Sequence, residues 1–479
     1  MRPIDRAALF VWKKRIPFLA VLILCLAAIP FLTRPPWFDE VLTLGWLTLG
    51  FAKIPFTYPI PNNHIVYTML LSLWNSAGGT LTDNWILFLR LLSLMTGSIA
   101  LWLSSRILIR RGGLISGAAC SALLAVSGPM VLFSTALRGY AAALLFCIAA
   151  FLAAEHWIKR KTVCGSAVLY LLFCFLAVGV MPTALFALLA GALFFLPALR
   201  DPEKRMRWIL LAAIPVLCVP LFYAHIFGKL VAASRLREGW TGYGAAYWNL
   251  YAAFGVSVLP LLAAASAGAW KLWKRRPALR LRLLGFLLIA LMPLFLLIPA
   301  NVPPFPRIFF PFFGIWCIIL VIPAREYFRT AGRIGTILFL LTVLLWVLLA
   351  PTATPAVSRL LFGPAGSDDL LCPYPVSEEF IPMEAVKTIR ANLPPDGAVF
   401  IDFDADPPSL RFILLNYGVP DTAILYDRPD FGQVISLPPG TLLVCRNRAD
   451  LEKLKQRFRL ATSPEPLLER GMQKVYRLK

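Results

Sequence analysis

Long apolar runs separated by short basic segments dominate the first 351 residues. A helix needs about 17 to 25 apolar residues to cross about 30 Å of hydrocarbon. Eleven runs of this length lie at approximately residues 16–33, 85–109, 114–133, 140–157, 163–181, 183–199, 208–227, 245–269, 282–300, 308–324 and 334–350. A further run, His64 to Ala77, has only 14 residues, which is typical of an interfacial or re-entrant segment. The pattern predicts a polytopic α-helical membrane protein with about eleven transmembrane helices.

The basic residues orient these predicted helices. With the N-terminus in the cytoplasm, 24 of the 32 Lys and Arg residues before position 352 lie on the cytoplasmic side, as the positive-inside rule requires. If His64–Ala77 also crossed the membrane, every later basic cluster would change sides and the bias would reverse. Because Pro30–Arg34 offers no small-residue cleavage site, we expect the first run to be an uncleaved anchor. The predicted location is the cytoplasmic (inner) membrane.

The remaining residues, 352–479, balance 15 basic with 16 acidic residues and alternate short helical and strand patterns. Predicted helices lie at Pro382–Asn392, Ser409–Tyr417 and Ala449–Phe458, and predicted strands at Ala398–Phe403, Ala423–Tyr426, Thr441–Cys445 and Gln473–Leu478. This alternation predicts a small α/β domain. The chain is therefore divided into a membrane domain, 1–351, and an extracytoplasmic (periplasmic) domain, 352–479, with linker at Pro351–Pro355 and Gly363–Gly366. In that compartment Cys372 and Cys445 are either a disulfide or two thiols.

Composition and charge narrow the class of protein. With 59% apolar and 15% charged residues, the chain is not a single soluble domain. A net charge of +22 would suggest nucleic-acid binding, but the basic residues lie in short clusters between apolar runs, so lipid is the expected partner. No P-loop, HExxH, CxxC or GxGxxG motif occurs in a suitable context, and no cofactor is expected. Asp402, Asp404 and Asp406 form either a solvated acidic loop or a weak site for a divalent metal such as calcium.

An acidic pair, Asp39–Glu40, follows the first helix directly after Pro35–Pro36–Trp37–Phe38. A carboxylate shielded by Trp37 and Phe38 could have a raised pKa and act as a general base. The alternatives are a solvated loop pair or acidic residues at a helix N-terminus after the two prolines. The spacing leaves these readings open.

Four arginines, Arg34, Arg90, Arg138 and Arg307, adjoin the outer ends of different predicted helices. Guanidinium groups in fixed positions could bind a lipid phosphate bidentately, and each alone could equally reach a phospholipid head group. His64, which follows Asn63 before the short apolar run, is either an interfacial hydrogen-bonding residue or part of a site. Convergence of these groups would indicate function, and the sequence does not show convergence.

The order of five short elements resembles the GT-C glycosyltransferases of the protein O-mannosyltransferase and aminoarabinose transferase type. These elements are Trp37-Phe38-Asp39-Glu40, Asn63-His64-Ile65-Val66-Tyr67, Arg90-Leu91-Leu92-Ser93, Arg138-Gly139-Tyr140 and Pro306-Arg307-Ile308-Phe309-Phe310-Pro311. The resemblance covers most of residues 16–325. It implies transfer of a monosaccharide, with inversion, from a polyprenyl-phosphate carrier to an acceptor hydroxyl at the outer face of the cytoplasmic membrane.

The resemblance also implies roles for individual residues. Asp39 would take the proton of the acceptor hydroxyl, and Glu40 would orient the loop or the acceptor. Cations would stabilise the departing phosphate, with no requirement for a metal. The residues implied for the phosphate are Arg90, Arg138 and Arg307, and those implied for donor or acceptor binding are Asn63, His64 and Tyr140. The acceptor is a glycan, a lipid or a protein.

Two other classes of function remain open. A lipid or sugar transporter or flippase would also be polytopic, but it usually places ionisable groups in mid-membrane and shows repeated halves. The predicted helix centres here are nearly free of charge, which favours the glycosyltransferase. A non-catalytic scaffold would tolerate any change at Asp39.

Overall fold

The computed structural model describes residues 3–47, 49–56, 64–78, 84–159, 164–228, 251, 254–295, 306–362, 382–402, 405, 407–426, 437, 440–446, 448–458, 464–470 and 473–478. The chain divides into two compact units. The first comprises Met1–Thr33 and Trp46–Leu371, and the second comprises Arg34–Gly45 and Cys372–Lys479.

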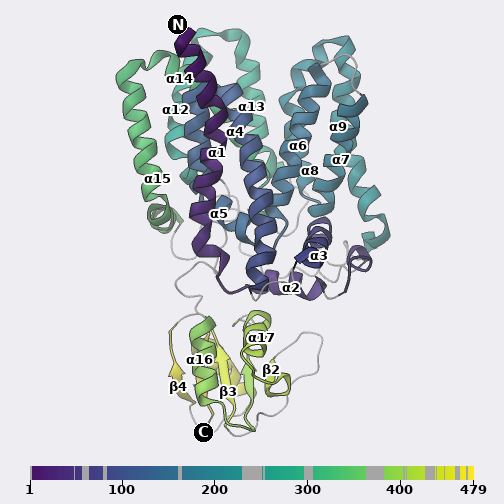
Figure 1. The fold of residues 1–479 in the computed structure, drawn as a ribbon, viewed down its shortest axis with the longest axis vertical. Helices are drawn as coiled ribbons and strands as arrows, with labels where there is room; N and C mark the ends of the chain where they lie inside the picture. The colour runs from purple at the N-terminus through teal and green to yellow at the C-terminus, as the bar shows by residue number, and fades with distance from the viewer. Residues whose placement is uncertain are drawn as a thin grey trace. The chain divides into compact units, whose positions relative to one another are not determined.

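The first unit is a bundle of long apolar helices (Figure 1). Its long helices are α1 (Pro3–Leu32), α4 (Trp85–Val126), α6 (Tyr140–Lys159), α7 (Cys164–Val180), α8 (Ala184–Phe194), α9 (Pro202–Tyr223), α12 (Leu259–Arg275), α13 (Arg280–Phe295), α14 (Phe312–Thr330) and α15 (Gly332–Phe362). Within the described ranges, five helices are long and apolar enough to cross a membrane. The others occupy predicted positions but are shorter or more charged, so the total of eleven crossings stays a prediction.

The chain reverses direction within α4, at the predicted position between two membrane segments. Gly113 has φ +83° and interrupts the helical backbone, a conformation that glycine adopts at no steric cost. On either side of this break, Gly117 lies against the backbone of Ile109, and Gly97 lies against Ser134 of α5 (Gly128–Thr135). The two halves are therefore antiparallel neighbours. α4 also packs against α1, α6 and α14.

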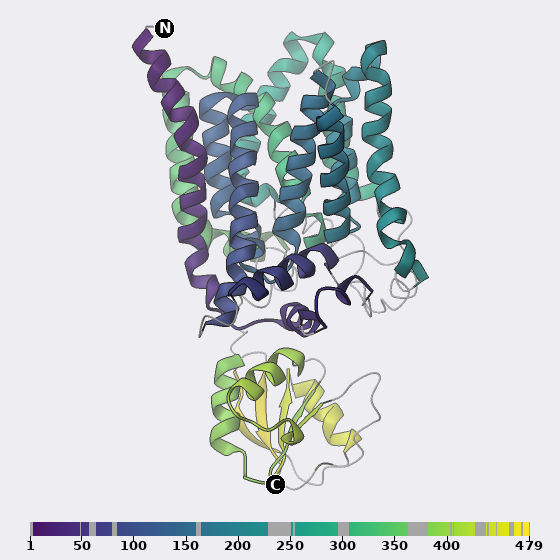
Figure 2. The same ribbon diagram turned by 45° about the vertical axis from the view of Figure 1, so that its right-hand side comes forward.

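Two segments that the sequence singled out are both helical. The short apolar run forms the 14-residue helix α3 (Ile65–Gly78), which lies across one end of the bundle rather than along it (Figure 2). The predicted linker at Pro351–Pro355 is wrong, because α15 continues through both prolines to Phe362. A proline removes only one helical hydrogen bond, and a helix satisfies its remaining backbone groups internally. The second linker segment, Gly363–Gly366, lies outside the described residues.

The C-terminal part of the second unit contains a five-stranded sheet in the order β2-β1-β3-β5-β4. Its strands are β1 (Val399–Ile401), β2 (Ile424–Tyr426), β3 (Leu442–Cys445), β4 (Glu465–Leu468) and β5 (Lys474–Arg477). β1 pairs in parallel with β2 and β3, whereas β5 is antiparallel to both β3 and β4. The sequence predicted four of these strands and missed β4, whose residues alternate little in polarity and are exposed or half-buried.

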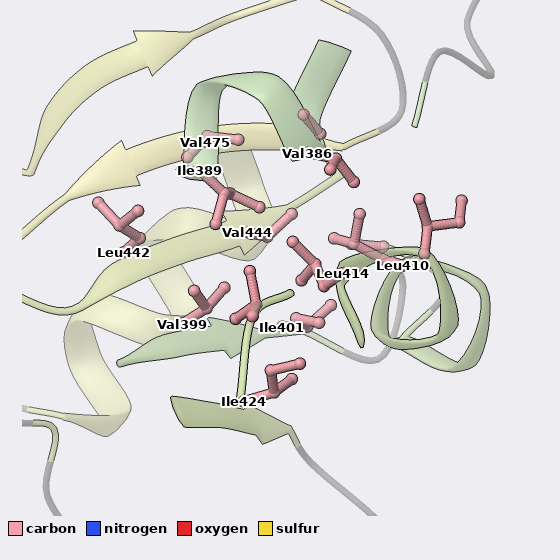
Figure 3. Close-up of a cluster of buried hydrophobic side chains, with 14 residues drawn as sticks. Val386, Ile389, Val399, Ile401, Leu410, Leu414, Ile424, Leu442, Val444 and Val475 are labelled. Atoms are coloured by element: carbon pink, nitrogen blue, oxygen red, sulfur yellow. The ribbon is translucent and has the colours of Figure 1, made fainter. Parts of the chain in front are cut away.

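Helices cover both faces of this sheet, since alternate strand residues point to opposite sides. Val399 and Ile401 of β1 join a core beneath α16 (Pro382–Asn392) and α17 (Pro407–Asn416), as Figure 3 shows. Phe400 between them joins a second core with α18 (Arg448–Arg457). In the described residues of this segment, a sheet is therefore packed between helices on both faces.

Of the two cysteines predicted to be either a disulfide or two thiols, the structure describes only Cys445. Cys445 is a buried free thiol at the end of β3. Burial, together with the negative charges of Asp402 and Asp450, raises the pKa of this thiol to about 12, so it is a poor nucleophile at neutral pH. Cys372 lies outside the described residues, as do Asp404 and Asp406.

Candidate active site

The acidic pair lies in the first turn of α2 (Phe38–Leu47). The N–H groups of Glu40 and Val41 donate to the Trp37 carbonyl at 2.9 and 3.0 Å, so Trp37 is the residue that caps the helix. The Glu40 carboxylate accepts the Trp37 N–H at 3.2 Å. A glutamate three residues after the capping residue commonly makes this bond. The sequence alternative of a helix N-terminal acid therefore describes Glu40 well.

Glu40 is also paired with an arginine. The two terminal nitrogens of Arg34 donate to the two Glu40 oxygens at 2.8 and 3.1 Å, a bidentate arrangement with directional strength. Both side chains are buried, and the Arg34 guanidinium lies 4.2 Å from the Trp37 ring centroid. These contacts fix the chain between the first helix and α2, which supports a positioning role for Glu40.

Asp39 lies next to this pair and is buried, with 4% of its surface exposed. Its backbone oxygen accepts the Thr43 hydroxyl at 3.0 Å, and Trp37 is similarly buried. The alternative of a solvated loop pair is therefore wrong. A carboxylate held away from bulk water at a helix start is suited to proton transfer or to ligand binding.

Replacing Glu40 with Gln should destabilise the protein by about 3 kcal/mol, because Arg34 then keeps a buried charge without its carboxylate. A double variant, Arg34→Gln with Glu40→Gln, should recover part of that loss. Thermal unfolding of the purified protein at a fixed detergent concentration measures both effects. Equal stability of the single variant and the wild type would show that the pair does not hold this segment.

In the first unit, the structure brings His64 together with Tyr140, another predicted site residue, and with the backbone of Gly139. The Gly139 N–H donates to His64 Nδ1 at 2.9 Å, and the Tyr140 ring meets the imidazole edge to face at 4.8 Å between centroids. Gly139 is required there, since a Cβ atom would collide with the imidazole. Because Nδ1 accepts a hydrogen bond, a neutral His64 carries its proton on Nε2.

The charge of His64 is set by burial and by arginines. Burial lowers the pKa of this imidazole well below its ordinary value, and the positive charges of Arg138 and Arg307 lower it further. His64 is therefore neutral at pH 7. Arg138 and Arg307, which are distant in sequence, therefore both lie close enough to His64 to act on its charge.

This environment predicts a pH dependence of stability. The unfolded His64 binds a proton near pH 6.5, while the folded protein resists protonation, so stability is fully present above pH 6.5 and falls below it. The slope is about 1.4 kcal/mol per pH unit until the folded pKa is reached. Unfolding followed from pH 7.5 to 5 should show this decline, and His64→Gln should flatten it. An unchanged slope in the variant would contradict the assignment.

Two residues that sequence reasoning missed connect the helices around this cluster. The Ser93 hydroxyl donates to the Ala136 carbonyl at 2.5 Å, and the Tyr67 hydroxyl lies 2.6 Å from Ser93. Ser93 has only one proton, so Tyr67 donates to it. This chain of bonds joins α3, α4 and the segment before α6. Both residues fell within the sequence elements noted above, but no spacing rule marks such a bond.

Of the remaining predicted site residues, three are buried within the helical bundle and one lies outside the described residues. Arg90 and Arg138 are fully buried, and Arg90 donates to the Leu32 carbonyl at 2.8 Å. Tyr140 is buried and packs on Phe133, which also contacts Phe310. Asn63 lies outside the described residues. No group of three or more metal-ligating side chains occurs in the part of the chain that the structure describes.

These features define a multi-pass helical membrane protein with buried charged residues near the ends of its helices. No protein-family model and no curated protein sequence matches the chain. Among solved structures, it is similar to ArnT from Cupriavidus metallidurans bound to undecaprenyl phosphate, with a TM-score of 0.55, 14% identity and coverage of 100% of this chain and 99% of ArnT. The apo ArnT structure gives a TM-score of 0.53 at 13% identity, over 96% of this chain and 97% of ArnT.

The similar structures also include the oligosaccharyltransferase AglB from Archaeoglobus fulgidus, in complex with an inhibitory peptide and a dolichol-phosphate. Its TM-score is 0.48 at 12% identity, over 84% of this chain and 63% of AglB. The chain therefore has the fold of ArnT, a GT-C glycosyltransferase, over its whole length, as its sequence elements predicted.

Proposed function

We propose that this protein is a membrane glycosyltransferase that moves a monosaccharide from a polyprenyl-phosphate carrier to an acceptor hydroxyl. The observation that carries the proposal is the similarity of the fold, over the whole chain, to ArnT bound to undecaprenyl phosphate. The buried carboxylate of Asp39 and the convergence of Arg138 and Arg307 on His64 support it. The reaction would occur at the outer face of the cytoplasmic membrane, with the N-terminus in the cytoplasm.

The proposed reaction is a single displacement. Asp39 takes the proton from the acceptor hydroxyl as its oxygen bonds to the anomeric carbon. The bond between that carbon and the phosphate oxygen breaks, and the configuration inverts. The electron pair leaves with the polyprenyl phosphate, which gains a negative charge. Preorganised cations are the direct way to stabilise that charge, so we assign this role to Arg90, Arg138 and Arg307 and expect no metal requirement.

His64 and Tyr140 suit the binding of a polar substrate beside these cations. A neutral imidazole can donate a hydrogen bond from Nε2 without adding a third positive charge near Arg138 and Arg307. The Tyr140 ring offers an aromatic face that can pack on a sugar or a polyprenyl chain. We assign both residues, with Asn63, to donor or acceptor binding.

Purified full-length protein should be incubated with a panel of short-chain polyprenyl-phosphate monosaccharides, and the released polyprenyl phosphate measured. We expect release from one donor in the panel and none with Asp39→Asn. A protein that is folded, releases no phosphate from any donor and moves the intact lipid across proteoliposomes would instead be a flippase. Release that persists unchanged in Asp39→Asn would exclude the assigned base.

A further inference from the structure

A cavity of about 770 Å³ lies between α1, α4, α6 and α14. Sixteen residues separate Arg106, which lines this cavity, from Arg90 in the same helical stretch, a distance of about 24 Å along the helix. The cavity is therefore remote from Arg90, which is assigned above to the donor phosphate. The charge pattern predicts this end of the helices to face the cytoplasm.

The lining of this cavity is strongly basic. Five of its residues are Lys or Arg, and none is acidic: Lys13, Lys14, Arg106, Arg110 and Arg325. Four different segments of the chain supply the lining, so the cations gather only in the folded state. A carboxylate that does not line the cavity, Glu155, pairs with Arg110 and also binds Arg111 and Lys159. One negative charge shared among three cations leaves the region positive.

Aromatic side chains form the apolar part of the cavity. The Arg106 guanidinium lies 4.8 Å from the Trp102 ring centroid, and Phe18 tilts against the same ring at 6.3 Å. This stacking holds the Arg106 guanidinium against the aromatic part of the cavity lining. An arginine fixed beside an aromatic ring is suited to a phosphate attached to a hydrocarbon.

An exposed apolar face of α1 leads away from the cavity. Phe18, Leu22 and Leu26 lie four residues apart, so they share one side of the helix. Their exposed fractions are 64, 54 and 58%. A small soluble anion would make no use of this surface, whereas the acyl chains of a lipid could lie along it.

We propose that this cavity binds the phosphate head group of an anionic phospholipid whose acyl chains follow α1. Basic pockets between transmembrane helices at the cytoplasmic side are suited to such head groups. The site is separate from the proposed donor site and does not depend on the glycosyltransferase function. Occupancy would fix α1 against α4 at the membrane surface.

The test is native mass spectrometry of the full-length protein in neutral detergent, titrated with phosphatidylglycerol. Phosphatidylcholine serves as the zwitterionic control and inorganic phosphate as the competitor. The pocket variant combines Lys13→Gln, Arg106→Gln and Arg325→Gln. The control variant removes three exposed cations elsewhere on the same predicted side: Arg275→Gln, Arg276→Gln and Arg333→Gln.

We expect one phosphatidylglycerol to bind tightly to the wild type, in preference to phosphatidylcholine. Each cation removed from the pocket should weaken binding about fivefold, or about 100-fold for three, while the control variant should bind nearly as the wild type does. Thermal unfolding without lipid checks that both variants are folded. Equal losses of affinity in the two variants would show that binding depends only on the general positive charge of this side. Displacement of the lipid by inorganic phosphate at the same concentration would show that the cavity prefers a free anion to a lipid. Either result would overturn the proposal.

Discussion

Replacing Asp39 with Asn should lower the rate of sugar transfer by about 10²- to 10⁴-fold, the usual contribution of a general base. The amide has nearly the same shape as the carboxylate, but it does not accept the proton of the acceptor hydroxyl. Asp39 is buried at the start of α2, beside the fixed Arg34–Glu40 pair. The rate is measured as polyprenyl phosphate released from the donor that the panel identifies.

A matched control is Asp421→Asn. This aspartate forms an exposed ion pair with Arg411 at 2.7 Å, and such pairs contribute at most about 1 kcal/mol. The control should transfer sugar at the wild-type rate. A variant at Asp39 that keeps its activity while remaining folded would show that the proton goes to another group.

Replacing Arg138 with Gln should lower kcat by about 10²- to 10³-fold, the cost of removing one preorganised group that stabilises developing negative charge. Arg138→Lys should restore part of the rate, because an ammonium keeps the charge but not the forked pair of donors. Arg329→Gln, in an exposed pair with Glu326, is the control. Turnover at saturating donor separates this effect from weaker donor binding.

A second readout distinguishes an electrostatic role for Arg138 from a merely structural one. Arg138 is one of the two arginines that lower the pKa of His64. Without it, that pKa should rise while burial still holds it below its ordinary value, so the folded protein should bind a proton at His64 at a higher pH than the wild type does. A variant whose activity falls while its pH profile is unchanged would contradict the electrostatic role.

The pattern of apolar and polar residues predicted much of the fold. The 14-residue length of α3, the reversal near Arg110–Arg111 and the helices and most strands of the α/β segment follow from hydrophobic period and run length alone. Such features depend on neighbouring residues in the chain. The prediction failed at Pro351–Pro355, where the prolines indicated a linker but the helix continues. It also failed at β4, a short strand whose residues show little alternation between polar and apolar.

The candidate site divides in a similar way. The sequence located Asp39, Glu40, His64, Arg138 and Arg307 as individual polar residues at the ends of apolar runs, where charge is costly without a purpose. It did not show that Glu40 pairs with Arg34, or that the backbone of Gly139 holds His64. Those partners are six and 75 residues apart, and no local periodicity relates them.

By itself, the sequence determined that this protein is a polytopic helical chain, gave its predicted orientation and identified which charged residues needed an explanation. Hydrocarbon thickness and the cost of charge in lipid impose those features on any chain, one segment at a time. Only the tertiary structure decided which side chains meet. It showed that Glu40 pairs with Arg34 while Asp39 is buried beside that pair. It also showed where five basic residues line one cavity. Contacts between distant segments depend on how helices pack, and packing is a property of the whole fold.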